Sequence, residues 1–198
     1  MTNYGHLVFV GTSAKPKWKN YSMINLQIKY VLDILEGKWY SKIVKYLILE
    51  NIRSAYNVGA MFRTADGAGV AKVFLIGYTP TPIDRFGRIQ PEIKKTSLGA
   101  STEIPWEHAD DIISIIAQLK KESVDIVAIE QHPTAQQLGD FKPQKNSAYI
   151  LGNEVAGVSA TAINLADRVV EIPMLGNKES LNVSVVAGII LYHGLNSK

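Results

Sequence analysis

From residue 46 onward, short and wholly apolar runs alternate with segments in which apolar residues recur at helical spacing. Apolar runs without polar alternation predict strands that are buried on both faces. The expected strands are residues 46–50, 71–77, 124–130, 148–152 and 168–174, and the expected helices are residues 57–69, 109–123, 159–167 and a last helix from Leu181 onward. Strands interleaved with helices in this way indicate an α/β fold, with a mostly parallel sheet covered by helices on both faces.

The first part of the chain has a different pattern. Residues 1–45 are expected to form an N-terminal accessory segment, followed by the main domain at residues 46–198. Lysines alternate with a proline and a tryptophan over residues 15–19, and an amphipathic helix is expected at residues 22–37. Lysines beside aromatic side chains can follow a phosphate backbone and stack on bases, but a solvated loop with Trp18 tucked inward explains the same pattern.

Composition limits the class of protein more than its function. The chain has 198 residues, 46% hydrophobic and 20% charged, which is enough apolar material for a sizeable core. It contains no cysteine, and its four histidines share no ligand spacing, so no metal site is expected. No apolar window has the length of a membrane span, and the N-terminus lacks a signal-peptide pattern, so we expect a soluble, cytoplasmic protein without a membrane partner. The net charge of +3 is compatible with an anionic partner such as nucleic acid.

Several common ligand-binding motifs are absent. The stretch "GNEVAG" has two glycines at P-loop spacing, but Val158 and Ser159 stand where lysine and serine or threonine are required. The stretch "GAGVAK" lacks the third glycine of the dinucleotide fingerprint, and no G-x-S-x-G elbow occurs. These observations argue against a P-loop nucleoside triphosphatase, an ordinary dinucleotide-binding enzyme and an α/β-hydrolase.

Polar residues gather directly after three of the expected strands, where ligands bind in parallel α/β sheets. They fall in three blocks, "NIRSAYNVGAMFRTADGAGV", "YILGNEVAGVSATAINLADRVVEIPM" and "GNKESLNVSVVAGIILYH". In this order the blocks resemble the three signature motifs of the SpoU (TrmH) branch of the SPOUT RNA methyltransferases. The stretches "TPIDRFGR" and "KTSLGASTEIPW" between the first two motifs are also similar to this family. The resemblance covers residues 46–193 and leaves the N-terminal segment without a counterpart.

This resemblance implies a fold, a cofactor and an activity. Members of the family transfer a methyl group from S-adenosylmethionine to a ribose 2′-hydroxyl of tRNA or rRNA. They have a deep C-terminal trefoil knot that forms the cofactor site, and they work as homodimers. A knot could not have been inferred from periodicity, because knots are very rare in proteins. The RNA and the nucleotide that are modified stay open.

The resemblance also implies catalytic roles for five residues, which are Asn57, Arg63, Glu154, Ser180 and Asn182. Arg63 is a poor proton acceptor, so we expect it to bind the neighbouring phosphate and stabilise the developing alkoxide, with a role as base left open. A surface ion pair with Asp66 is the alternative for Arg63. Helix capping is the alternative for Asn57 and Ser180, and a first-turn acid is the alternative for Glu154.

A cofactor site is implied at Leu151, Gly152, Asn153, Gly157, Ile172, Met174, Leu181 and Asn182. Ile172, Met174 and Leu181 are expected to flank the adenine, although the same residues would look no different as plain sheet core. The two glycines permit close approach of a ligand, and a tight turn explains them equally.

Asn182 is the most informative polar residue of the third block. It is expected two positions into a helix that is otherwise rich in leucine, valine and isoleucine, where an unpaired amide costs about 1–3 kcal/mol. Its presence is easiest to understand if the start of this helix faces a polar ligand. Ser184 is interpreted as packing.

Three hypotheses follow for the function. The first is an RNA ribose 2′-O-methyltransferase, because all three motif blocks are intact. The second is a catalytically inactive, RNA-binding relative that acts as a structural or assembly factor. The third is an unrelated α/β cofactor enzyme whose motif match is accidental.

Overall fold

The computed structural model describes residues 44–194, which lie within one compact unit, Lys42–Lys198. Its elements in chain order are β1 (Val44–Glu50), α2 (Ala55–Gly67), β2 (Lys72–Ile76), α3 (Pro91–Ser97), α4 (Ala100–Glu103), β3 (Trp106–Ala109), α5 (Ile112–Lys121), β4 (Asp125–Ile129), β5 (Gln136–Gln137), the 3₁₀ helix η1 (Leu138–Asp140), β6 (Asn146–Leu151), α6 (Ala160–Leu165), β7 (Arg168–Glu171) and α7 (Val183–Tyr192). The lysine-rich stretch at residues 15–19 and the helix at residues 22–37 lie outside the described residues. The domain boundary at residues 45 and 46 therefore stays a prediction.

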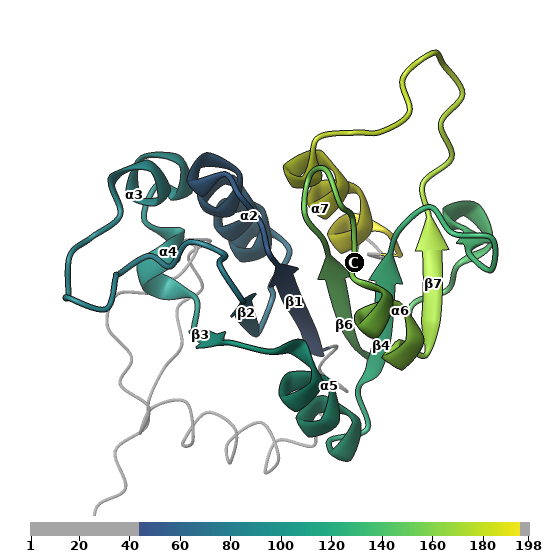
Figure 1. Cartoon of the computed structure of the whole chain (residues 1–198), viewed down its shortest axis with the longest axis horizontal. Helices are drawn as coiled ribbons and strands as arrows, with labels where there is room; N and C mark the ends of the chain where they lie inside the picture. The colour runs from purple at the N-terminus through teal and green to yellow at the C-terminus, as the bar shows by residue number, and fades with distance from the viewer. Residues whose placement is uncertain (1–43, 195–198) are drawn as a thin grey trace, which may run out of the picture. The chain divides into compact units, whose positions relative to one another are not determined.

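Within the described range, seven strands form one sheet in the order β3-β2-β1-β6-β4-β7-β5 (Figure 1). All pairings between these strands are parallel, which confirms the predicted parallel sheet. Leu47 and Leu49 of β1 point into a core shared with α2, α3 and α7, and Ile48 points into a second core shared with α5 and α6. Neighbouring side chains of a strand point to opposite faces, so this division confirms that helices cover both faces.

Every strand and helix that the apolar pattern predicted between residues 46 and 194 is present in the structure. Boundaries moved by three residues or fewer, as at β7, which ends at Glu171 instead of residue 174. The pattern did not name α3, α4, β3, β5 or η1, which are between two and seven residues long. Elements this short carry too few positions for a period to be recognised. No helix of residues 44–194 is long and apolar enough to cross a membrane.

The helices of one face bring distant parts of the chain together. Helix α2 packs against both α3 and α7 (Figure 1). At the contact with α3, a Cβ on Gly59 would lie 2.0 Å from Thr96 Oγ1 and 2.7 Å from the Ile93 carbonyl oxygen. The absence of a side chain at Gly59 therefore lets the two helices pack closely.

We expect Gly59→Ala to destabilise the protein. Alanine in a helix interior is normally favoured over glycine by about 0.5–1 kcal/mol. Here the new methyl group would force α2 and α3 apart, at a cost of about 1–3 kcal/mol. Urea denaturation should therefore give a lower free energy of unfolding than for the parent protein.

The matched control is Gly139→Ala, because nothing lies within 4 Å of a Cβ at that position. Its free energy of unfolding should stay close to that of the parent protein. A Gly59→Ala variant as stable as the parent would contradict the packing account.

Candidate functional site

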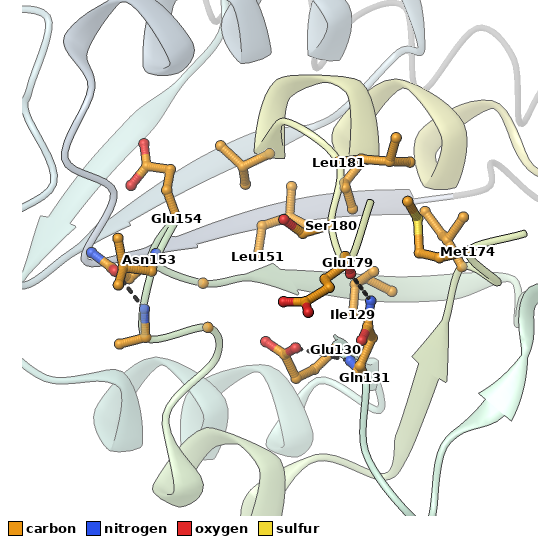
Figure 2. Close-up of a pocket in the computed structure, with 17 residues that line it drawn as sticks. Ile129, Glu130, Gln131, Leu151, Asn153, Glu154, Met174, Glu179, Ser180 and Leu181 are labelled. Atoms are coloured by element: carbon orange, nitrogen blue, oxygen red, sulfur yellow. Dashed lines mark hydrogen bonds between the residues drawn. The ribbon is translucent and has the colours of Figure 1, made fainter. Parts of the chain in front are cut away.

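A cavity of about 350 Å³ opens beyond the carboxyl ends of β4, β6 and β7 (Figure 2). It is lined by residues 151–157 after β6, by residues from the segment 172–181 after β7, and by residues 129–131 at the end of β4. Val183 and Val186 of α7 complete the wall. This is the edge of the sheet at which the sequence predicted a ligand site.

Seven of the eight residues predicted to bind a cofactor line this cavity. They are Leu151, Gly152, Asn153, Gly157, Ile172, Met174 and Leu181. The eighth, Asn182, follows directly after the lining residue Leu181 but is not itself part of the lining. Two of the residues predicted to be catalytic, Glu154 and Ser180, also line the cavity.

Three lining residues at the end of β4 were not predicted from the sequence, namely Ile129, Glu130 and Gln131. The Glu130 carboxylate accepts hydrogen bonds from the backbone N–H groups of Val158, at 2.8 Å, and Gln131, at 2.9 Å. Gln131 Nε2 donates to the Glu179 carbonyl at 2.6 Å. These contacts tie together the segments that follow β4, β6 and β7. A signal was present, because Glu130 directly follows an apolar run and the same strand-end rule applies to it.

The glycines of the second block form a tight turn. The backbone groups of Asn153 and Gly157 hydrogen-bond to each other in both directions. A Cβ on Gly152 would lie 2.2 Å from the Gly157 carbonyl carbon. Gly157 has a φ of 71°, and a Cβ there would lie 2.3 Å from a Glu130 carboxylate oxygen. The turn alone therefore accounts for both glycines.

Asn153 holds this turn against two neighbouring loops. Its side-chain oxygen accepts from the N–H groups of Val155 and Ala156, both at 2.8 Å. Its Nδ2 donates to the Asn51 carbonyl at 2.9 Å and to the Tyr78 hydroxyl at 2.7 Å. The amide of this buried residue is thus fully used within the protein.

Glu154 joins the second block to the first. One carboxylate oxygen accepts from the Arg53 N–H at 3.0 Å, and the other accepts from the Ser54 N–H at 3.3 Å and from Asn57 Nδ2 at 3.0 Å. Partial burial opposes ionisation, but hydrogen bonds from Arg53, Glu154 itself, Asn57 and Ser54 outweigh it and hold the pKa of the Glu154 carboxyl below its ordinary value. Glu154 is therefore a carboxylate at neutral pH and positions the start of α2.

An amide contact extends this network to the third block. Asn182 Nδ2 donates to Asn57 Oδ1 at 3.3 Å, and Asn57 donates in turn to Glu154. Glu154, Asn57 and Asn182 thus form a hydrogen-bonded chain, which we call the Glu154–Asn182 chain. Its members come from three blocks that lie far apart in the sequence.

The capping alternatives for Asn57 and Ser180 are wrong. Helix α2 begins at Ala55, and Ser54 caps it by accepting from the Asn57 N–H at 3.2 Å. Helix α7 begins at Val183 with Asn182 as its N-cap, because Asn182 Oδ1 accepts from the Ser184 N–H at 2.8 Å. Asn182 is exposed and precedes the first helical residue, so the expectation that it lies two positions into the helix was wrong.

Arg63 lies away from the Glu154–Asn182 chain. It follows Asn57 by six residues on α2, which corresponds to about 9 Å along a helix axis. It lines a separate groove together with Lys95, Thr96 and Tyr192. None of the ion pairs found among residues 44–194 joins it to Asp66. The structure therefore brings together four of the five predicted catalytic residues at or beside the cavity, and places Arg63 on a neighbouring surface.

The cavity combines apolar walls with two further carboxylates. Ile172, Met174 and Leu181 offer contacts for a flat apolar ring, and turn backbone groups can recognise its polar edge. Glu130 and Glu179 line the same cavity and favour a positively charged ligand (Figure 2). Between residues 44 and 194, no three histidine, aspartate or glutamate side chains group as a metal site would require.

Comparison with known sequences gives a family match over most of the chain. Residues 45–192 match the sequence model of the SpoU rRNA Methylase family. The 23S rRNA (guanosine-2′-O-)-methyltransferase RlmB of Bordetella pertussis is 29% identical over 171 residues, which cover 86% of this chain and 65% of that protein. An uncharacterized tRNA/rRNA methyltransferase of Archaeoglobus fulgidus is 36% identical over 146 residues, which cover 74% of this chain and 62% of that protein. The chain thus spans slightly less than two thirds of the length of these relatives.

Solved structures show the same architecture. The AdoMet-bound rRNA methyltransferase from Sinorhizobium meliloti, where AdoMet is S-adenosylmethionine, superposes with a TM-score of 0.68 and 26% identity. That match covers 77% of this chain and 57% of the other. The TrmH/SpoU tRNA modifying enzyme of A. aeolicus gives a TM-score of 0.66 and 25% identity, over 87% of this chain and 83% of the other.

Glu154 makes stability depend on pH in a defined direction. Its folded-state pKa is below the ordinary value of 4.5, so its stabilising contribution is present above the unfolded-state pKa and is lost as the pH falls through the folded-state pKa. Glu154→Gln removes the charge at every pH. We therefore expect the difference in free energy of unfolding between parent and variant to narrow from about pH 7 to about pH 3. Urea denaturation at several pH values measures it.

The matched control is Glu103→Gln, at an exposed residue of α4 whose carboxylate accepts no hydrogen bond from any residue between 44 and 194. The free energy of unfolding of this variant should differ little from that of the parent, and by a nearly constant amount over this pH range. A constant difference for Glu154→Gln as well would mean that the carboxylate does not hold the loops together.

Proposed function

Because the chain belongs to the SpoU rRNA Methylase family, we propose that it transfers a methyl group from S-adenosylmethionine to a ribose 2′-hydroxyl of RNA. The observation that carries the proposal is the cavity at the carboxyl edge of the sheet, with the Glu154–Asn182 chain beside it. A cofactor in the cavity and a ribose at the chain would then be neighbours. The names of the relatives, which are rRNA and tRNA methyltransferases, support the same activity.

The cavity residues fit this cofactor. Ile172, Met174 and Leu181 would flank the adenine, and the turn at residues 152–157 would offer backbone groups to it. The carboxylates of Glu130 and Glu179 would attract the positive charge of the sulfonium. When bound, S-adenosylmethionine supplies an activated methyl group on a cationic sulfur. The cavity volume of about 350 Å³ is within the range of about 300–1,000 Å³ found for small-molecule sites.

The residues of the Glu154–Asn182 chain would orient the ribose. Methyl transfer requires the 2′-oxygen in line with the methyl carbon at near-attack distance, so positioning supplies much of the rate. Asn182 caps α7, and the partial positive charge at the start of this helix would stabilise an oxygen that loses its proton. Glu154 already accepts three hydrogen bonds and has a lowered pKa, so it would position Asn57 and would not act as the base.

Arg63 would act from its own groove. The adjacent Lys95 makes this surface cationic, which suits an RNA phosphate next to the reacting ribose. The separation of Arg63 from the Glu154–Asn182 chain is also the one observation that favours the alternative of an inactive, RNA-binding relative. Saturable binding of S-adenosylmethionine, followed by methyl transfer, distinguishes the two.

A deep trefoil knot belongs to the same proposal. After β7 the chain returns past the end of β4, where Gln131 contacts Glu179, and then forms α7. The end of α7 lies between β1 and the β4–β6 connection, because Lys45 Nζ donates to the Leu191 carbonyl and His193 Nε2 donates to the Phe141 carbonyl. These two hydrogen bonds fix the chain end against segments that lie far from it in the sequence, which supports the proposal of a knot.

We also include a homodimer and a cytoplasmic location in the proposal. Tyr56 on α2, and Val185 and Tyr192 on α7, each expose about half of their surface although their helices pack against each other. Exposed apolar side chains on neighbouring helices suit an interface with a second copy. A cytoplasmic location follows from an rRNA or tRNA substrate, and the choice between these two RNAs stays open.

The purified protein should transfer labelled methyl groups from S-adenosylmethionine to RNA and produce alkali-resistant dinucleotides, which mark 2′-O-methylation. Asn182→Asp keeps an oxygen to cap α7 but puts a negative charge where the 2′-oxygen is expected to gain one. We expect the rate of transfer to fall by about 100-fold or more, while the helix stays capped and S-adenosylmethionine still binds. Single-turnover kinetics measures the rate of transfer, and calorimetric titration measures S-adenosylmethionine binding.

The control is Asn164→Asp, which adds the same charge at an exposed position of α6. This variant should methylate RNA at the parent rate. The proposal fails if the parent protein binds no S-adenosylmethionine, or if it methylates only bases.

A further inference from the structure

The segment that follows β2 exposes an unusual set of side chains. It borders a second cavity, of about 870 Å³, which Tyr78, Phe86 and Trp106 help to line. Phe86 exposes 66% of its surface and Tyr78 exposes 61%. Because burying apolar rings would stabilise the fold, two rings left in solvent at one cavity suggest a binding surface.

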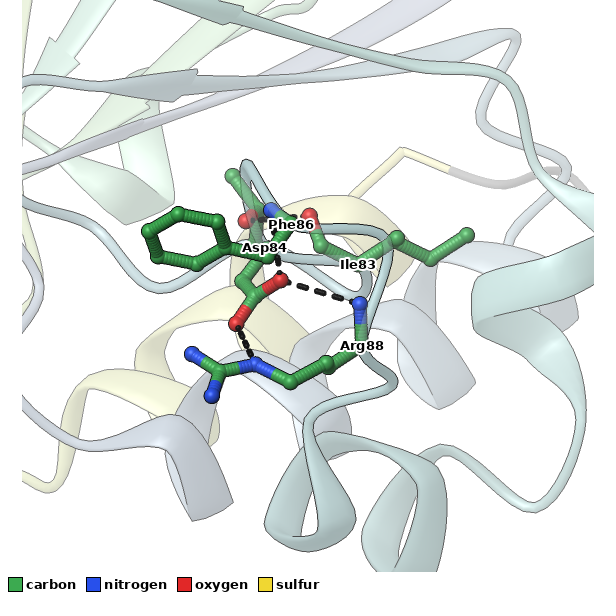
Figure 3. A network of polar contacts seen from close by, with 5 residues as sticks. Ile83, Asp84, Phe86 and Arg88 are labelled. Atoms are coloured by element: carbon green, nitrogen blue, oxygen red, sulfur yellow. Dashed lines mark hydrogen bonds and ion pairs between the residues drawn. The ribbon is translucent and has the colours of Figure 1, made fainter.

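The tip of this segment is held in one shape. The Asp84 carboxylate accepts from the N–H groups of Phe86, at 2.8 Å, and Arg88, at 2.9 Å, and from Arg88 Nε at 2.7 Å (Figure 3). Ile83 and Ile89 pair across the base of the tip as an antiparallel bridge. The exposed ring of Phe86 is therefore presented by a preorganised turn, which lowers the entropy cost of binding.

Two guanidinium groups flank the exposed ring. Arg85 Cζ lies 4.8 Å and Arg88 Cζ lies 5.0 Å from the centroid of Phe86. Asp84 pairs with Arg88 and leaves Arg85 as excess positive charge at the tip. An exposed aromatic ring next to cations is the combination with which proteins bind unpaired nucleotides, since the ring stacks on a base and the cations contact phosphates.

The tip is connected to the candidate site. The Tyr78 hydroxyl accepts a hydrogen bond from Asn153, which lines the cofactor cavity, while Tyr78 also lines the second cavity. Tyr78 therefore links a lining residue of the first cavity to the second cavity. Asn153 directly precedes Glu154, so this contact joins the second cavity to the loop that carries the Glu154–Asn182 chain.

We propose that the tip formed by Asp84, Arg85, Phe86 and Arg88 binds an unpaired nucleotide of the RNA substrate, with its base on Phe86 and its phosphates on the arginines. This inference rests on the proposed function and adds to it a preference for RNA with unpaired nucleotides near the methylated ribose. Protein partners are a poorer fit, because the apolar ring lies beside two cationic groups instead of within an apolar patch.

The test compares variants that separate stacking, charge and bulk. Phe86→Leu keeps apolar bulk but removes the aromatic face, and Phe86→Trp keeps the face. Arg85→Ala removes one cation and leaves the Asp84 hydrogen bonds intact. Ile113→Ala and Lys121→Ala on α5 are matched controls for an exposed apolar residue and an exposed cation. The probes are a fluorescein-labelled RNA hairpin with an unpaired loop and the corresponding fully paired duplex, with binding followed by fluorescence anisotropy.

We expect Phe86→Leu to weaken hairpin binding by about 5- to 100-fold and to leave duplex binding nearly unchanged. Phe86→Trp should bind the hairpin within about 2-fold of the parent. Arg85→Ala should lower the slope of log K against log salt concentration by about 0.7, the value for one phosphate contact on a single strand. Both α5 controls should bind the two RNAs with the affinity and salt dependence of the parent.

Equal hairpin affinity of Phe86→Leu and the parent would overturn the inference. So would a changed sedimentation coefficient for Phe86→Leu without RNA, because the tip would then be a protein interface. Calorimetric titration with S-adenosylmethionine should give the same affinity for Phe86→Leu and the parent. A parent protein that binds the hairpin through Phe86 but binds no cofactor would contradict the proposed function and leave the nucleotide-binding tip intact.

Discussion

The arrangement of the site depends on the hydrogen bonds that the Glu154 carboxylate accepts. It accepts hydrogen bonds from two backbone N–H groups at the start of α2 and from the Asn57 amide, which itself contacts Asn182 at the start of α7. Parallel strands bring their carboxyl ends to one edge of the sheet, but they do not fix the loops that follow. Glu154 fixes them, and Glu130 does the same for the turn after β6 and the segment after β4.

This arrangement has consequences for chemistry. Asn57, Glu154 and Asn182 make hydrogen bonds within the protein, so their main role in the proposed reaction is to hold a ribose and a cofactor in a fixed relation. Proximity of that kind can account for a large part of a rate enhancement. Positive charge lies at the start of α7, in the groove of Arg63 and Lys95, and at the tip with Arg85.

The sequence predicted the sheet well because each long strand is an uninterrupted apolar run, as in β1, whose Leu47, Ile48 and Leu49 serve both cores. The rule that ligands bind at strand ends predicted the edge of the sheet where the cavity lies, and the resemblance to a known family supplied nine of the lining residues and their roles. The capping of α7 by Asn182 could not be predicted, because the pattern gives helix boundaries only to within a few residues. The position of Arg63 depends on how α2, α3 and α7 pack, which no local pattern contains.

Hydrogen–deuterium exchange with and without S-adenosylmethionine tests most directly whether the cavity is the cofactor site. Binding there should protect backbone amides of residues 152–158 and 172–183, since these segments form its walls, and should leave α5 unchanged. Protection confined to other segments, or no protection at saturating cofactor, would contradict the account.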